Sequence, residues 1–198
     1  MAVETTLAGG GAEYPLRFDI EYPEKLSRLL VFVKWLLVIP HILIVYALLM
    51  AVSIVQLIAF FAVLFTKQYP KDLFDFVVNV YRWEANIIAY FGDMRDEYPP
   101  FSWEAGQYPV TFEVDYPVEM NRWLPLIKWL LAMPHYVVLL FLITAALLVW
   151  LIAFFAIIIT GQYPRGMFDF NVGVLRWYSR YNAYVYFMRD EYPPFSLK

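Results

Sequence analysis

Residues 34–65 read KWLLVIPHILIVYALLMAVSIVQLIAFFAVLF, and residues 128–159 read KWLLAMPHYVVLLFLITAALLVWLIAFFAIII. Apart from the Lys and the His that each run contains, the only strongly polar residues are Ser53, Gln56 and Thr144. A transmembrane helix needs about 20 consecutive apolar residues, so each run exceeds the length of one span. These two runs predict an α-helical membrane protein.

The two runs belong to a duplication that covers nearly the whole chain. Residues 14–102 align with residues 108–196 at a constant offset of 94 positions, without a gap and with 44 identical positions. Residues 94–102, MRDEYPPFS, return unchanged as residues 188–196. Because both copies carry the same signals, we expect them to have the same orientation in the membrane.

The alignment also predicts the domain boundaries. They are a flexible, cytoplasmic tail (1–13), a first membrane repeat (14–103), a linker (104–107) and a second membrane repeat (108–198).

The composition agrees with a membrane protein and argues against several kinds of site. Apolar residues make up 62% of the chain, against about 45–50% in soluble domains. Cysteine is absent, which excludes disulfides and thiolate chemistry. The net charge of −3 and the absence of a Lys/Arg cluster argue against nucleic acid as a partner. No triad, zinc spacing, P-loop or dinucleotide glycine pattern is present, so we do not expect an enzyme.

Each repeat begins with a short alternating segment. In residues 14–23, Leu16, Phe18 and Ile20 alternate with charged residues, and residues 108–117 keep this pattern. A period of two is typical of a strand with one covered face. Because a lone strand leaves backbone groups unpaired, we predict that the two strands pair across the repeat axis.

The apolar run can cross the membrane in two ways. As one helix, residues 29–65 would reach about 55 Å, against a hydrocarbon core of about 30 Å, and Pro40 interrupts the pattern. Either residues 25–65 form a hairpin followed by an interfacial helix, or residues 41–93 form a hairpin preceded by one. Basic residues flank the first hairpin, and Lys and Arg tend to stay cytoplasmic, which favours the first route. Both routes predict about four crossings, and we expect the N-terminus to be cytoplasmic.

A polar stripe follows on the next predicted helix. Its residues recur at intervals of three and four and therefore share one helix face: Asp72, Asp75, Asn79, Arg82 and Asn86. The second repeat keeps the aspartate and the arginine, as Asp169 and Arg176. This helix either lies in the headgroup plane or crosses the bilayer with its stripe turned toward protein.

Ionisable side chains within a membrane are costly and are functional candidates. The candidates are Lys34, Asp75 and Arg82 in the first repeat, and Lys128, Asp169 and Arg176 in the second. We favour structural pairing that fixes how the helices dock, with the two lysines extending to the headgroups. The alternative is a transport path or lipid site lined by the stripe.

His41 and His135 are the only histidines, and they occupy equivalent positions. Two histidines related by a pseudo-twofold axis can ligate a haem. We favour the simpler interpretation that each lies at the proline break and donates to a backbone carbonyl. No metal or cofactor is otherwise expected, although a bound lipid is compatible with this class of protein.

The repeated loop containing YPPF has two interpretations. Its consecutive prolines fix an extended chain that is able to bind a partner. We favour the alternative that Tyr98 and Phe101, with their copies, pack back on the strand or the membrane interface.

Three blocks together resemble a known family. They are KWLL followed by Pro-His, the segment TGQYPRGMFDFNVGVLRW (160–177), and DEYPPFSL (190–197). The combination resembles a bacterial family of membrane proteins, catalogued as a domain of unknown function and often found in tandem copies. The resemblance covers residues 14–197. The first repeat departs from the pattern where the second has glycines, at Lys67, Asp72 and Asn79. The resemblance implies an integral membrane protein and supplies no catalytic residue.

The sequence therefore predicts an all-α polytopic protein of the inner (cytoplasmic) membrane, with minor β structure. Each of the two repeats would hold a short strand, a proline-broken apolar segment and an amphipathic helix. We expect a structural or accessory component, in contact with membrane lipids, that forms a homo-oligomer or joins a larger complex. The alternatives are a membrane-shaping hairpin protein, and a small transporter or lipid-binding protein that uses the Asp/Arg stripe.

Overall fold

The computed structural model describes residues 14–198, so the expected tail lies outside the described residues. The elements follow in this order: β1 (Leu16–Ile20), η1 (Leu30–Phe32), α1 (Lys34–Leu37), α2 (Ile39–Thr66), α3 (Lys71–Phe91), β2 (Val110–Val114), α4 (Leu124–Leu131), α5 (Met133–Thr160) and α6 (Arg165–Val185). Each half contains a strand, a short helix, a 28-residue helix and a 21-residue helix. The predicted tandem, mostly helical fold with minor β structure is confirmed.

The two strands form an antiparallel pair, as the alternation predicted. Phe18 lies opposite Phe112, and Leu16 lies opposite Val114. Phe112 is the copy of Phe18, so the pairing is symmetric about an approximate twofold axis that passes between these two residues. An axis that relates two antiparallel strands in this way is perpendicular to the sheet. The apolar side chains of β1 are buried, also as predicted.

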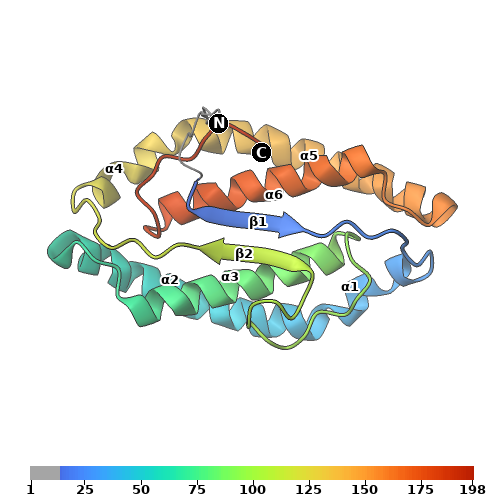
Figure 1. Ribbon diagram of the computed structural model, residues 1–198, viewed down its shortest axis with the longest axis horizontal. Coiled ribbons are helices and arrows are strands. Elements are labelled where there is room, and N and C mark those ends of the chain that lie inside the picture. The colour runs from blue at the N-terminus through green and yellow to red at the C-terminus, as the bar shows by residue number, and fades with distance from the viewer. Residues whose placement is uncertain (1–13) are drawn as a thin grey trace, which may run out of the picture.

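The protein has three layers, and Figure 1 looks through them along the shortest axis. The sheet is in front. Behind it, α3 packs against β2 and α6 against β1, and the two long helices α2 and α5 lie at the back against α3 and α6. All four long helices follow the long axis, and α2 and α5 run in opposite directions (Figure 1). The strands lie near the middle of that axis.

The prolines start the long helices and do not break them. Pro40 lies in the first turn of α2, where its missing N–H removes no helical hydrogen bond. The helix then continues without interruption to Thr66, about 42 Å in all. Lys67 ends α2 with a φ of 60°, and Gly161 ends α5 with a φ of 75°. Glycine suits this left-handed conformation better than lysine does.

The hairpin of residues 25–65 that we favoured is therefore wrong. Residues 25–38 contain only η1 and the four-residue α1, which are too short to cross a membrane. Among the described residues, two helices are long and apolar enough to span a membrane, namely α2 and α5. The predicted set of about four crossings is not found.

Candidate functional site

The two long apolar helices are exposed over most of their surface. In their most apolar windows, only 28% of the residues in α2 and 11% in α5 are buried. The core helix of a soluble protein would be mostly buried instead. Large exposed side chains include Leu43, Phe61 and Phe65 on α2 and Phe141, Leu148 and Ile159 on α5. Exposed apolar surface of this extent marks a site of contact with lipid or with a partner.

Two exposed tryptophans extend this apolar surface beside the long helices. Trp35 in α1 and Trp129 in α4 are 59% and 61% exposed. Each indole N–H donates to a backbone carbonyl one turn earlier, at 2.8 Å and 2.9 Å respectively. Exposed tryptophan is common at the boundary between a membrane and water.

The opposite, sheet-bearing face is charged. Arg17 on β1 pairs with Glu113 on β2 and with Asp115, both at 3.0 Å, and all three side chains are about half exposed. Arg176 of α6 pairs with Asp19 of β1 at 2.9 Å. The protein therefore has a charged front and an apolar back.

Lys34 and Lys128 are buried and do not extend to the headgroups as we expected. The Nζ of Lys34 lies 2.8 Å from the carbonyl oxygen of Arg95 and 2.8 Å from the carboxylate of Asp96. Lys128 makes the same two contacts in the second repeat, at 2.7 Å and 2.8 Å. Asp96 also accepts the backbone N–H of Ser27. Each lysine thus attaches the segment before its long helix to the MRDEYPPF loop.

The two histidines are enclosed within their own repeats. The Nδ1 of His41 accepts the indole N–H of Trp83 at 3.1 Å, and its ring stacks on Phe101 with centroids 3.9 Å apart. His135 has the same contacts in the second repeat, at 3.0 Å and 3.9 Å. The partner of Nδ1 is thus an indole in both repeats, and the backbone of Pro193 is a further hydrogen-bond partner of His135. His41 and His135 lie near the starts of α2 and α5, at opposite ends of the long axis, so the structure does not bring them together as haem ligands (Figure 1).

This arrangement also accounts for the YPPF loop. The Tyr98 hydroxyl donates to the carbonyl oxygen of Leu37 at 3.1 Å, while Phe101 covers the ring of His41. The loop thus packs back on α1 and α2, and not on the strand as we expected.

The Asp/Arg stripe separates into two parts. Asp75 pairs with Lys71, and Asp169 with Arg165, within one turn of the same helix. Arg82 and Arg176 turn toward the sheet, where their Nε atoms donate to the carbonyls of the opposite phenylalanines, Phe112 and Phe18, at 3.1 Å and 2.8 Å. The arginines therefore attach α3 and α6 to the strands, whereas we had expected pairing that fixes how the helices dock.

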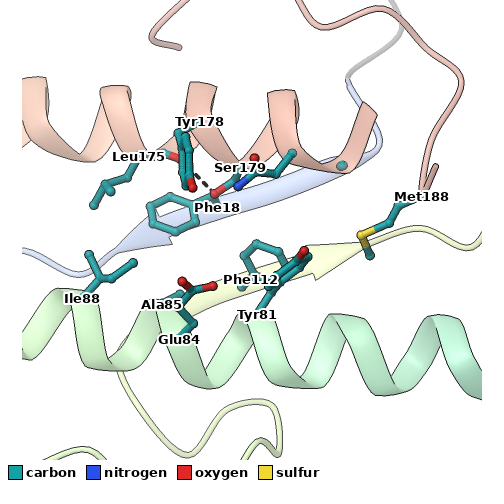
Figure 2. A pocket seen from close by; sticks show the side chains of 12 residues that line it. Phe18, Tyr81, Glu84, Ala85, Ile88, Phe112, Leu175, Tyr178, Ser179 and Met188 are labelled. Carbon is teal, nitrogen blue, oxygen red and sulfur yellow. Dashed lines mark hydrogen bonds between the residues drawn. The ribbon is translucent and has the colours of Figure 1, made fainter. Parts of the chain in front are cut away.

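A polar cleft lies at the repeat axis behind the sheet. Figure 2 shows Tyr81 and Glu84 of α3 and Tyr178 of α6 around a small cavity beside Phe18 and Phe112. Glu84 and Tyr178 are equivalent positions in the two copies, so the axis passes between them. A neighbouring hollow of about 380 Å³ continues this cleft toward α2, where Ser53 and Gln56 line it.

Glu84 and Gln56 are unusual because, within the described residues, neither side chain forms an ion pair or a hydrogen bond of regular geometry. Glu84 is partly buried, and burial raises the pKa of its carboxyl group. Gln56 is only 7% exposed. It lies beside the Tyr81 hydroxyl, yet neither polar atom of its side chain has a hydrogen-bond partner of acceptable geometry within residues 14–198.

Sequence reasoning missed this cleft. Gln56 was noted only as one of the few polar residues in its run, and Glu84 lies off the polar stripe. The signal was present in the alignment of the copies, because Glu84 is replaced by Tyr178 and Gln56 by Trp150. Two polar residues that occur in only one copy indicate an asymmetric feature. Across residues 14–198, no group of three or more His, Cys, Asp or Glu side chains is arranged to hold a metal ion.

These features define a mostly helical protein of two tandem copies, each with one exposed helix long and apolar enough to span a membrane. The chain belongs to the family described as a domain of unknown function (DUF4389), whose model matches residues 28–102 and 123–196, one copy in each repeat. The family resemblance expected from the sequence blocks is confirmed. Neither a curated protein nor a solved structure matches the chain.

Proposed function

We propose that this protein is a structural membrane protein that lies flat in one leaflet. In this arrangement α2 and α5 are embedded parallel to the membrane plane, and the sheet faces water. Membrane lipids are its partners. The observation that carries the proposal is the position of the charged sheet, which lies near the middle of the long axis and opposite the apolar helices (Figure 1).

The competing arrangement is a pair of membrane-spanning helices. The membrane normal would then follow the long axis, and the two copies would be inverted, because the twofold axis is perpendicular to that direction. The sheet would lie near the bilayer midplane. Its charged side chains are exposed there, among them Asp19 at 67% and Glu113 at 46%. A charged side chain near the midplane costs about 3 kcal/mol on insertion scales, and more in simulations.

The flat arrangement avoids this cost. The membrane normal follows the twofold axis, so both copies have the same orientation, as the duplication suggested. The exposed sides of α2 and α5 contact acyl chains, and Trp35 and Trp129 lie near the boundary. The 28-residue length of these helices, well beyond the roughly 20 residues of a span, also needs no tilt or thickening of the bilayer.

The flat arrangement also suggests what the protein does. A helix is about 10–12 Å across with its side chains, so two embedded helices fill much of one leaflet in a core of about 30 Å. Material inserted into one leaflet alone expands that leaflet and favours curvature. The proposed function is therefore membrane shaping, with in-plane helices in place of the hairpins that the sequence suggested.

Orientation is tested by single cysteines in this cysteine-free chain. Gln68 and Gln162 lie in the two turns that follow α2 and α5, at opposite ends of the long axis (Figure 1). A membrane-impermeant maleimide should label Gln68→Cys, Gln162→Cys and the sheet variant Thr111→Cys from the same side. Ser53→Cys on α2 should be protected. Labelling of the two turns from opposite sides of the membrane would refute the flat arrangement.

Shaping is tested separately, by adding the purified protein to liposomes at increasing protein-to-lipid ratio. Electron microscopy should show tubules or smaller vesicles in proportion to the protein incorporated. If the vesicles keep their shape while the cysteine labelling pattern is as expected, membrane shaping is refuted. The flat orientation in the leaflet would still hold.

A further inference from the structure

The polar cleft belongs to a row of neighbouring hollows, here called the groove, which lies beside α2 on one side of the repeat axis and beside α5 on the other. Neighbouring hollows share lining residues along the back of the protein. Gln56 and Tyr186 belong both to the central hollow and to the hollow beside α4, while Ile88 and Leu175 connect the axial cavity to a hollow beside α5. The groove is floored by α3 and α6. In the flat arrangement it opens into the leaflet.

The groove is polar in its middle and apolar on one side. The hollow beside α5 has a volume of about 210 Å³, and apolar side chains make up nearly all of its lining, including Phe91, Leu147 and Trp150. The middle contains Gln56, Glu84 and Tyr178. This combination fits a molecule with one polar head and one apolar chain.

The middle of the groove contains polar side chains that lack regular hydrogen bonds to the rest of the protein. Gln56 is only 7% exposed, and although the Tyr81 hydroxyl lies beside it, neither polar atom of its side chain forms a hydrogen bond of acceptable geometry in the described part of the chain. Buried polar groups in proteins are nearly always hydrogen-bonded, so an unpartnered amide pointing into a hollow indicates a missing ligand. The carboxyl group of Glu84, which is only partly buried, lines the same hollow.

The charge of the residues in the middle of the groove indicates the charge of the ligand. No Lys, Arg or His is among the residues that line the axial cavity and the central hollow. An acid without a basic neighbour favours a cation, and the face of the Tyr178 ring suits one as well. The amide oxygen of Gln56 accepts a further N–H. An ammonium head donates to the Glu84 carboxylate and to the amide oxygen of Gln56, whereas a carboxylate or phosphate head would repel Glu84.

We propose that the groove binds a single-chain amphiphile with an ammonium head, which enters from the leaflet. The head lies between Glu84 and Gln56, and the chain lies in the apolar hollow beside Trp150. The proposal rests on the flat arrangement, because the groove must open into acyl chains for such a ligand to enter.

The test uses the full chain in phosphatidylcholine nanodiscs and three photoreactive probes of equal chain length: dodecylamine, dodecanol and dodecanoic acid, each with a diazirine on the chain. The amine should label peptides of α5 that line the apolar hollow, and the acid should label them at background level. Glu84→Gln should lower labelling by the amine about tenfold, to the level of the alcohol, because one charge-assisted hydrogen bond is lost. Equal labelling by amine and acid would overturn the proposal.

Two further variants make the outcome decisive. Glu24→Gln removes the same charge from an exposed position and should leave labelling unchanged. Ala146→Phe fills the apolar hollow and should abolish labelling by all three probes, whatever the state of Glu84. Labelling by the amine that persists in both Glu84→Gln and Ala146→Phe would place the probe outside the groove. The cysteine pattern of Gln68 and Gln162 reports the orientation independently in every variant, so failure of binding is distinguishable from failure of the flat arrangement.

Discussion

Replacing Lys34 by Met should strongly destabilise the protein, because it leaves buried acids without their cation. Lys34 is 1% exposed, and its Nζ lies 2.8 Å from Asp96 and 3.5 Å from Asp93. Removing one partner of a buried ion pair costs about 3–5 kcal/mol. Asp96 remains a quarter exposed, so water screens part of this loss. We therefore expect a decrease of about 3 kcal/mol in the free energy of unfolding of Lys34→Met.

The second repeat offers a natural comparison. Lys128 pairs with Asp190 at 2.8 Å but has Phe187 in place of the second acid, Asp93. Lys128→Met leaves one carboxylate without its cation, whereas Lys34→Met leaves two. The loss in the free energy of unfolding should therefore be about 1 kcal/mol smaller for Lys128→Met. Adding Asp96→Asn to Lys34→Met should recover part of the loss, since a neutral amide tolerates burial better than an unpaired carboxylate.

The assay is equilibrium unfolding by urea in mild detergent, followed by tryptophan fluorescence. Lys71→Met is the matched control, because Lys71 pairs with Asp75 at the surface, where both side chains are about half exposed. Such exposed pairs contribute about 0.2–1 kcal/mol. If Lys34→Met and Lys71→Met lowered the free energy of unfolding equally, the argument from burial would be refuted.

Three other outcomes are expected. Burial raises the pKa of Glu84 in the folded protein, so its ionisation opposes folding. The free energy of unfolding should therefore fall as pH rises above about 4.5, until the folded pKa is passed. In urea titrations at a series of pH values, Glu84→Gln should remove this part of the pH dependence. Trp83→Phe removes the donor to a buried imidazole and should cost about 1–3 kcal/mol in the same titrations, whereas Trp35→Phe, at an exposed indole, should cost much less. Leu148→Asp puts a charge on the exposed side of α5 and should reduce the fraction of protein that floats with liposomes, while Thr111→Asp on the sheet should not; equal flotation would contradict an embedded α5.

Features specified within a few residues were predictable from the sequence. The alternation around Phe18 shows which strand face is covered, and the duplication supplies the matching strand around Phe112. The helix ends were harder, because a proline ends a helix when it lies inside and is tolerated when it lies in the first turn. We expected Pro40 to interrupt the helix, but it lies in the first turn of α2. Because of this error, we predicted a turn within what is the continuous helix α2. We therefore expected twice as many membrane crossings.

Features that depend on distant segments were not predictable. The environment of Lys34 is set by Arg95 and Asp96, about 60 residues later in the chain, so the lysine alone gave no sign that it would be buried. The same holds for Glu84. Its lack of a partner depends on what α6 presents across the axis, and position alone on α3 does not reveal it.

The symmetric strand pairing makes a further prediction about the isolated repeats. Because Phe18 pairs with its own copy, a fragment of the first repeat, residues 14–107, should dimerise through β1 in the same register. Arg17 would then lie opposite Asp19 of the second molecule, twice per dimer, in place of its present partner Glu113.

A fragment of the second repeat, residues 108–198, should dimerise more weakly. Its strand has Thr111 at the position equivalent to Arg17, so the same register sets Thr111 opposite Glu113 and forms no ion pair. Opposite charges across strands stabilise a sheet, and two lost pairs should weaken the dimer by roughly fivefold to tenfold. Arg17→Thr in the first fragment should reproduce that loss in sedimentation equilibrium in detergent. A first-repeat fragment that is folded and monomeric at all concentrations would show that the strands do not hold the two copies together, and the symmetric construction inferred from Phe18 and Phe112 would fail.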